Sequence, residues 1–121
     1  MITVNETATN LDDGIKNMMN GAKKDYERWS TQNGQKELSG YCKDQVDSWD
    51  DKITVKNGKR YMKIIKENSV FAFIMKEDFK HFKKGDILKP AGWAKPALNS
   101  ARGNVLEGNF AIQWTGPLYL K

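Results

Sequence analysis

The sequence is poor in the side chains that carry most enzymatic and metal chemistry. Its 121 residues include one histidine, His81, and one cysteine, Cys42. Ser-His-Asp and Cys-His arrangements need a histidine beside the nucleophile, and Cys42 falls on the apolar stripe of an expected helix. Zinc sites need three or four Cys, His or acidic ligands at short spacing, which the sequence does not offer. We therefore expect a binding protein and not an enzyme, with no catalytic residue, no cofactor and no metal.

Other features are also missing. The longest apolar run, residues 70–75, is far shorter than the roughly 20 residues that a membrane-spanning helix needs. The first ten residues, MITVNETATN, lack the basic and apolar pattern of a secretion signal, and a single thiol is typical of a reducing compartment. Neither GxxxxGK[ST] nor GxGxxG occurs, so the two common phosphate-loop fingerprints are absent. These absences predict a cytoplasmic protein with no membrane partner.

Charge is distributed unevenly along the chain. Residues 1–52 carry seven basic and ten acidic side chains, whereas residues 53–121 carry thirteen basic and five acidic ones. The second part therefore has a net charge of +8, which would attract a phosphate, a nucleotide or a nucleic acid. A lysine-rich solvated surface would have the same composition, so charge alone does not choose between these interpretations.

Hydrophobic spacing predicts two helices in the first part. Residues 11–29 place their apolar side chains on one helical stripe, with Asn10 as the N-cap and Asn33-Gly34 as the stop. Gly14 and Gly21 lie on or near this stripe, where they either allow another helix, for example one from a second copy, to approach closely or are simply tolerated. A second helix is predicted over residues 36–49.

The second part follows the period of β-strands. Two strands flank Asn57-Gly58, which predicts a hairpin with a type I′ turn. Residues 70–75 are apolar at every position and predict a central strand; residues 86–89 and 110–115 predict two more. The expected fold class is α+β, with two N-terminal helices followed by an antiparallel β-sheet curled into a small barrel or roll. We expect one domain over residues 1–121, with a helical oligomerisation part (1–52) and a β-sheet ligand-binding part (53–121).

A long loop joins two strands of that expected sheet. Residues 85–109 read GDILKPAGWAKPALNSARGNVLEGN and hold four of the ten glycines and two of the three prolines. Loops longer than about 12–15 residues are usually functional or disordered, and the prolines favour an ordered, functional loop. As a ligand site it would offer rings for a base, cations for phosphates and amides for ribose or base edges; the candidates are Phe82, Trp93, Lys89, Lys95, Arg102, Asn99 and Asn104. A structural interpretation stays open, in which Trp93 covers the sheet, the amides form turns, and Arg102 pairs with Glu107 or Asp86.

The run KKGDILKPAGW at residues 83–93, with Ala97, Asn99, ARGNV at 101–105 and the closing WTGPLY at 114–119, resembles small phage and prophage proteins. Within that group the chain most resembles the first type of the Thoeris anti-defence sponge family. Members sequester cyclic ADP-ribose isomers made by bacterial immune TIR enzymes without cleaving them, and some also hold cyclic oligonucleotides.

The resemblance implies specific roles and partners. Phe82 would stack on the adenine, Asn99, Arg102 and Asn104 would hold the ribose and phosphates, and Arg28 or Arg60 would enter the site from a neighbouring chain. The protein would act in the cytoplasm of an infected bacterial cell as a homodimer or a dimer-based hexamer assembled through its helices.

Two alternatives remain open beside the sponge. One is a nucleic-acid-binding β-barrel module that uses a set of basic residues on phosphates: Lys56, Lys59, Arg60, Lys63, Lys80, Lys83 and Lys84. The other is a phage accessory or structural protein whose helices only oligomerise. The sponge is preferred, so a small cyclic nucleotide, and not nucleic acid, is the expected partner.

Overall fold

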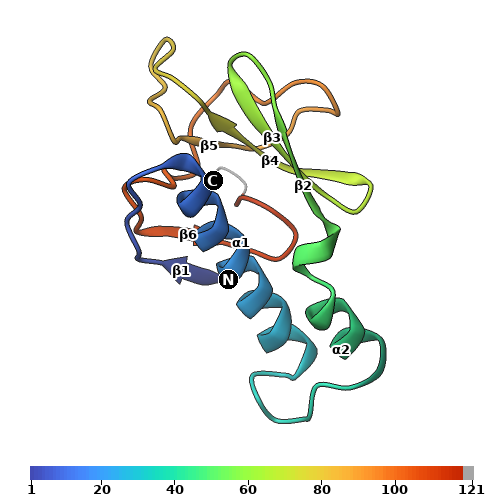
Figure 1. The fold of residues 1–121 in the computed structure, drawn as a ribbon. Coiled ribbons are helices and arrows are strands. Elements are labelled where there is room, and N and C mark those ends of the chain that lie inside the picture. Colours follow the sequence, from blue (N-terminus) through green and yellow to red (C-terminus); the bar gives the residue numbers. More distant parts are fainter. Residues whose placement is uncertain (119–121) are drawn as a thin grey trace.

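Helices and strands share the chain in the α+β arrangement expected from the sequence. The computed structural model describes residues 1–118. Its elements, drawn in Figure 1, are β1 (Ile2–Val4), α1 (Leu11–Ser30), α2 (Gly40–Asp47), the 3₁₀ turn η1 (Asp50–Lys52), β2 (Ile53–Asn57), β3 (Tyr61–Lys66), β4 (Ser69–Met75), β5 (Ile87–Leu88) and β6 (Phe110–Ile112). Figure 1 shows the larger sheet near the start of α1 and α2 beside its C-terminal end.

Helix α1 begins and ends close to where the sequence predicts. The Asn10 side chain accepts a hydrogen bond from the Asp13 backbone N–H at 2.9 Å, which satisfies one of the free donors of the first turn. Most of the predicted stripe is buried, with Met18 and Met19 at 0% and 3% exposure, but Trp29 at its end is 60% exposed. This confirms the helix, its cap and the face that packs on the core.

The two helical glycines allow close packing within one chain. A Cβ on Gly14 would lie 2.7 Å from the Val105 carbonyl oxygen, and a Cβ on Gly21 would lie 2.6 Å from Val4 Cγ2. The close approach inferred from the sequence is therefore present. Its partners are β1 and the segment before β6 of the same chain, which makes a second copy unnecessary to explain either glycine.

The second helix is shorter than predicted. It spans Gly40–Asp47, not residues 36–49; its later start is explained by Gly40, whose φ angle is 58°. A right-handed helix that began at residue 36 could not continue through this left-handed position. Trp49 nevertheless reaches the core, where it is 1% exposed.

The larger sheet is antiparallel, in the order β2-β3-β4-β5. The β2–β3 hairpin is confirmed by its register, which runs from Ile53 opposite Lys66 to Asn57 opposite Met62. The prediction of a type I′ turn is wrong, because neither Asn57 nor Gly58 has the positive φ angle that this turn requires. β4 is confirmed as a central, buried strand.

The expected barrel or roll is not closed within residues 1–118. β6 does not join the larger sheet; it pairs antiparallel with β1, from Ile2 opposite Ile112 to Val4 opposite Phe110. These four apolar side chains are buried and form one core with the α1 stripe. The long loop therefore connects two separate sheets, and a strand precedes the two helices. Both points correct the sequence-based expectation.

Candidate functional site

The long loop is ordered by backbone hydrogen bonds to β5. Ile87 N–H donates to the Gly103 carbonyl at 2.9 Å, and Arg102 N–H donates to the Ile87 carbonyl at 2.8 Å. Farther out, Ala97 N–H donates to the Lys89 carbonyl at 2.8 Å. The loop thus leaves β5, turns and returns along it, which explains how a segment with so little apolar periodicity holds one conformation.

Asn104 joins the two ends of the loop instead of facing a ligand. Its Nδ2 donates to Asp86 Oδ1 and to the Lys84 carbonyl, both at 2.9 Å. Its Oδ1 accepts from the backbone N–H groups of Leu106 at 2.8 Å and Glu107 at 3.1 Å. The side chain is buried and both ends of its amide are occupied, so the predicted contact with a base or ribose is not available in this structure.

Phe82 also belongs to the core. It is 2% exposed and packs in a cluster with Phe73, Met75 and Leu88. The His81 ring lies over it, with ring centroids 4.0 Å apart. The face expected to stack on adenine is therefore covered by protein.

Three other predicted site residues form hydrogen bonds within the protein: Asn99, Arg102 and Lys89. Arg102 Nη1 donates to Asn99 Oδ1 at 3.2 Å and to the Ser100 carbonyl at 2.8 Å, and neither suggested ion pair of Arg102 forms. Lys89 Nζ donates to the Pro117 carbonyl at 2.9 Å. Burial, with repulsion from Arg102, lowers the pKa of Lys89. These side chains shape the loop but line none of the cavities described next.

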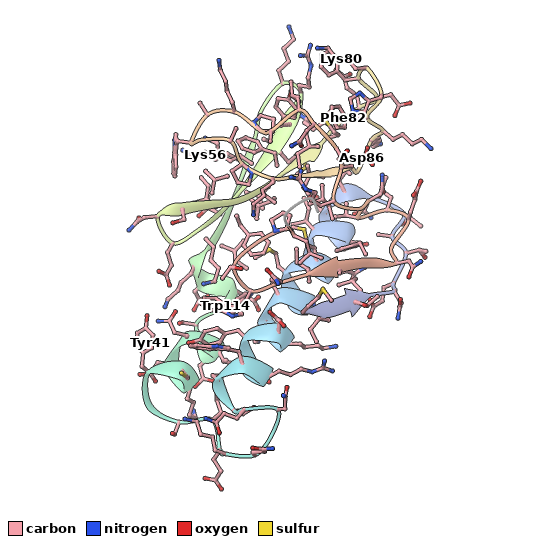
Figure 2. All side chains as sticks on the ribbon, turned by 180° about the vertical axis from the view of Figure 1, so that it is seen from behind. Tyr41, Lys56, Lys80, Phe82, Asp86 and Trp114 are labelled. Atoms are coloured by element: carbon pink, nitrogen blue, oxygen red, sulfur yellow. The ribbon has the colours of Figure 1, made fainter. Side chains whose placement is uncertain are left out.

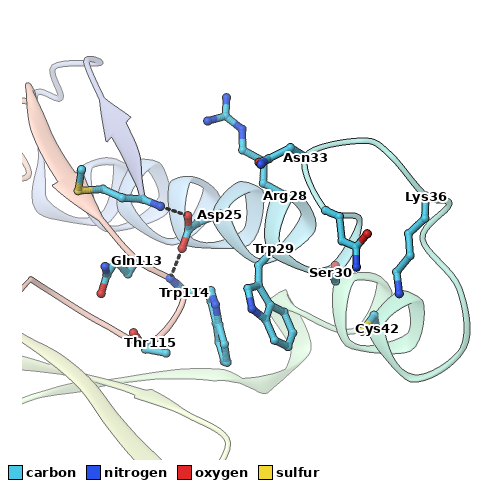
Figure 3. A pocket seen from close by; sticks show the side chains of 12 residues that line it. Asp25, Arg28, Trp29, Ser30, Asn33, Lys36, Cys42, Gln113, Trp114 and Thr115 are labelled. Carbon is cyan, nitrogen blue, oxygen red and sulfur yellow. Dashed lines mark hydrogen bonds and ion pairs between the residues drawn. The ribbon is translucent and has the colours of Figure 1, made fainter.

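A cavity with a volume of about 810 Å³ lies at the C-terminal end of α1. We call it the helix pocket. It is lined by residues from α1, from the segment after it, and from the turn after β6: Met1, Asp25, Arg28, Trp29, Ser30, Gln32, Asn33, Lys36, Cys42, Gln113, Trp114 and Thr115 (Figure 3). Asp25, Arg28 and Trp29 come from the last turns of α1, which ends at Ser30, and Gln32 comes from the segment after it.

Two indoles form one side of this pocket. The rings of Trp29 and Trp114 have centroids 5.2 Å apart, and Trp29 is 60% exposed. The buried Asp25 carboxylate accepts from the Trp114 backbone N–H at 2.9 Å, which fixes the turn after β6 against α1. Its other oxygen contacts the Met1 amino group. Asp25 of α1 therefore holds the turn that carries Trp114 and the N-terminus of the chain beside the indole pair.

Positive charge lies on other sides of the same pocket. In Figure 3 the Arg28 side chain and the two indoles lie on opposite sides of the last turns of α1, with Lys36 at a third. Within residues 1–118 neither Arg28 nor Lys36 forms an ion pair. Arg28 is the one predicted site residue that lines the pocket, and it does so within its own chain.

Sequence reasoning missed Trp29 and Trp114 as site residues. It assigned Trp29 to the buried stripe of α1 and Trp114 to the last strand, and nothing in their spacing indicates that they meet. The available signal was the position of Trp29 at the very end of the stripe, beside Arg28, where a helix often leaves the core.

The Tyr26 phenol, whose ring lies against those of Trp29 and Trp114, is held in its protonated form. Burial, followed by interaction with Cys42, raises the pKa of Tyr26 to about 12, so the phenol stays protonated at neutral pH. His81 does not line the pocket. In the part of the chain that the structure describes, no group of three His, Cys, Asp or Glu side chains is placed to hold a metal ion.

A second cavity lies at the tip of the β2–β3 hairpin and has a volume of about 260 Å³. Its lining within the described residues contains no acidic side chain and consists of Lys56, Asn57, Gly58, Lys59, Arg60, Tyr61, Lys63, Phe73 and Ala94. Trp93, a predicted site residue, is 52% exposed next to it, with Lys63 Nζ 4.5 Å from its ring centroid. We call residues 56–63 with Phe73, Phe79, Lys80, Trp93 and Ala94 the hairpin face.

These features define a small α+β domain with an indole- and arginine-lined pocket at one end and a basic, aromatic face at the other. The chain belongs to DUF7717, a family of unknown function, whose model matches residues 3–120. No curated protein and no solved structure matches the chain. No helix within residues 1–118 is long and apolar enough to cross a membrane.

Proposed function

We propose that the protein binds and sequesters a cyclic adenine nucleotide, such as a cyclic ADP-ribose isomer, and does not cleave it. The observation that carries the proposal is the helix pocket, with its indole pair on one side and, on another, a guanidinium that has no ion-pair partner among residues 1–118. On this proposal the protein acts in the cytoplasm of an infected bacterial cell, where such a signal is made.

The size and chemistry of the helix pocket suit such a ligand. Its volume of about 810 Å³ lies within the range of about 300–1,000 Å³ that is usual for small-molecule sites. Adenine has a flat face for Trp29, and stacking of this kind contributes about 1–3 kcal/mol per base. Arg28 can hold a phosphate by two parallel hydrogen bonds, and Lys36 adds a second cation.

This assignment changes the residues that the resemblance implies. Trp29 takes the stacking role expected of Phe82, and Arg28 with Lys36 takes the phosphate role expected of Arg102. Sequestration needs tight binding and no bond-breaking group; a sub-nanomolar complex corresponds to more than about 12 kcal/mol of binding free energy. The protonated Tyr26 phenol and the hydrogen-bonded Asp25 fit a pocket that holds a ligand without acting on it.

The test is calorimetric titration of the protein with cyclic ADP-ribose isomers and cyclic oligonucleotides, followed by heat denaturation and mass analysis of the released ligand. We expect one of these ligands to bind and to be released intact. Trp29→Ala and Arg28→Gln should each weaken binding about tenfold, as expected for loss of a stacking or charge-assisted contact.

Arg60→Gln is the matched control, because Arg60 is an exposed arginine on the hairpin face and its loss should leave this binding unchanged. Failure of every tested ligand to bind would contradict the proposal. Release of a degraded product would show that the protein is an enzyme.

A further inference from the structure

Three cations of the hairpin face, Arg60, Lys63 and Lys80, lie against aromatic rings and not carboxylates. Arg60 Cζ lies 3.7 Å from the Phe79 ring centroid, and Lys80 Nζ lies 5.3 Å from the same centroid. Lys63 Nζ lies 4.5 Å from the Trp93 ring centroid and 5.9 Å from that of Phe73. The ion pairs within residues 1–118 join Met1 to Asp25, Lys43 to Asp47 and Lys52 to Glu67, so the positive charge of this face is not neutralised by the protein.

The hairpin tip that carries these cations is fixed in place. Lys76 Nζ donates to the Gly58 carbonyl at 2.8 Å, and Lys76 N–H donates to the Arg60 carbonyl at 3.0 Å. Both bonds tie the tip to the residue that follows β4. An anion would therefore meet charges already in position, which reduces the entropy lost on binding.

The cavity at this face is too small for a whole nucleotide but is large enough for one flat ring. Its volume of about 260 Å³ is below the usual range of small-molecule sites, which begins near 300 Å³. Around it, Lys56, Lys59 and Arg60 are exposed, and Trp93 offers about half of its surface. This combination of a single-base cavity, an exposed indole and several separated cations fits a ligand that extends beyond the cavity.

We propose that the hairpin face binds single-stranded nucleic acid. One unpaired base stacks on Trp93 at the cavity, and the phosphates on either side pair with Lys56, Lys59 and Arg60. Stacking on an indole needs a base that is free of a partner strand, so duplex DNA could use only the cations. The site is separate from the helix pocket: Figure 2 shows Lys56 and Lys80 at one end of the molecule and Tyr41 and Trp114 at the other.

The experiment measures fluorescence anisotropy of labelled oligo(dT) and oligo(U) of about 12 nucleotides, within the usual site sizes of single-strand binders, beside a duplex of equal length. We expect both single strands to bind more tightly than the duplex. Three phosphate contacts predict a slope of about −2 for the logarithm of the association constant against the logarithm of the salt concentration.

Two exposed positions test the two parts of the interface. Trp93→Ala should weaken binding about tenfold at every salt concentration, because it removes a stacked base. Lys59→Gln should make the salt slope shallower by about 0.7, because it removes one phosphate contact.

Tyr41→Ala and Lys24→Gln are the matched controls, since both side chains are exposed and lie outside the hairpin face; they should change neither quantity. The proposal is overturned if the duplex binds as tightly as the single strands, if binding does not depend on salt, or if Trp93→Ala binds like the unchanged protein. Arg28→Gln should leave this binding intact, which separates the outcome from that of the helix pocket.

Discussion

At the scale of single residues, Asn104 shows how one amide can hold a long loop. It donates to Asp86 and the Lys84 carbonyl and accepts from two backbone N–H groups, all within a buried site. Asn104→Asp keeps the shape but replaces a donor with an oxygen that faces another carboxylate and a carbonyl. We expect a loss of about 3 kcal/mol in the free energy of unfolding, measured by urea denaturation.

The matched control is Asn99→Asp, an equal change in an exposed part of the same loop. Its cost should stay within about 0.5 kcal/mol. Equal effects of the two substitutions would mean that the Asn104 network does not hold the loop.

For Gly14→Ala we expect a loss of stability, whereas helix propensity alone would predict a gain. Glycine to alanine inside a helix normally stabilises by about 1 kcal/mol. At Gly14 the new Cβ would lie 2.7 Å from the Val105 carbonyl oxygen, a backbone atom that cannot rotate away. Overpacking of this kind costs about 1–3 kcal/mol, so we expect Gly14→Ala to lower the thermal midpoint.

Gly92→Ala serves as its control, because no atom lies within 4 Å of a Cβ built there. It should change the midpoint little. A higher midpoint for Gly14→Ala than for the unchanged protein would show that α1 can move away from the segment before β6.

Residue types alone could not separate ligand-binding side chains from structural ones. Asn10 was predictable as a cap because its bond reaches only three residues along the chain. Asn104 and Asn99 have the same chemistry, but the partners of Asn104 include Asp86, eighteen residues away. Whether Phe82 faces solvent likewise depends on β4 and β5, which pack over it only in the folded chain.

At the scale of elements, the C-terminal end of α1 carries an aromatic cluster centred on Tyr26. Its ring centroid lies 5.8 Å from that of Trp29, 5.9 Å from Trp49 and 5.3 Å from Trp114. Burial in this cluster raises the Tyr26 pKa from 10.0 to about 12. Because of this raised pKa, the stability of the protein depends on the protonation of Tyr26 at alkaline pH.

The raised pKa sets the sign of that dependence. Below pH 10 the phenol is protonated in both folded and unfolded chains, and its contribution to stability is fully present. Between pH 10 and about 12 the unfolded chain loses the proton first, so the free energy of unfolding falls, by up to about 1.4 kcal/mol per pH unit from this group.

Urea denaturation across this range should show a steeper fall for the unchanged protein than for Tyr26→Phe. The comparison cancels the titration of Lys66 and Lys89, whose pKa values burial lowers. Parallel curves for the two proteins would contradict the assignment.

Helices and strands were predictable where the periodicity of their own apolar residues extends over enough positions to be recognised. α1, the β2–β3 hairpin and β4 follow from their own periodicity, and each is confirmed. β1 has only three residues, and its alternation of Ile2 and Val4 is too short to stand out from a polar segment. The pairing of β6 with β1 joins residues about 110 positions apart, so no local signal could select it over the larger sheet.

At the scale of the whole molecule, the apolar stripe of α1 is already covered within one chain. Met18, Met19 and Ala22 are buried in the same core as Ile2, Val4 and Ile112. The homodimer or dimer-based hexamer implied by the resemblance stays a prediction. If it forms, its interface must use other surfaces than this stripe.

The same core predicts that both sheets unfold together. It contains Ile112 from the smaller sheet, Ile74 from the larger one, Met18 from α1, and Trp49, so both sheets share this core with α1, although the larger sheet also has the small separate cluster around Phe82. In a Trp93→Phe variant, the three remaining tryptophans all belong to the cluster at the end of α1. Its fluorescence then reports that end alone, whereas far-ultraviolet circular dichroism reports helices and strands throughout. We expect the two signals to give the same urea midpoint, and a lower midpoint for fluorescence would show that the α1 end opens before the larger sheet does.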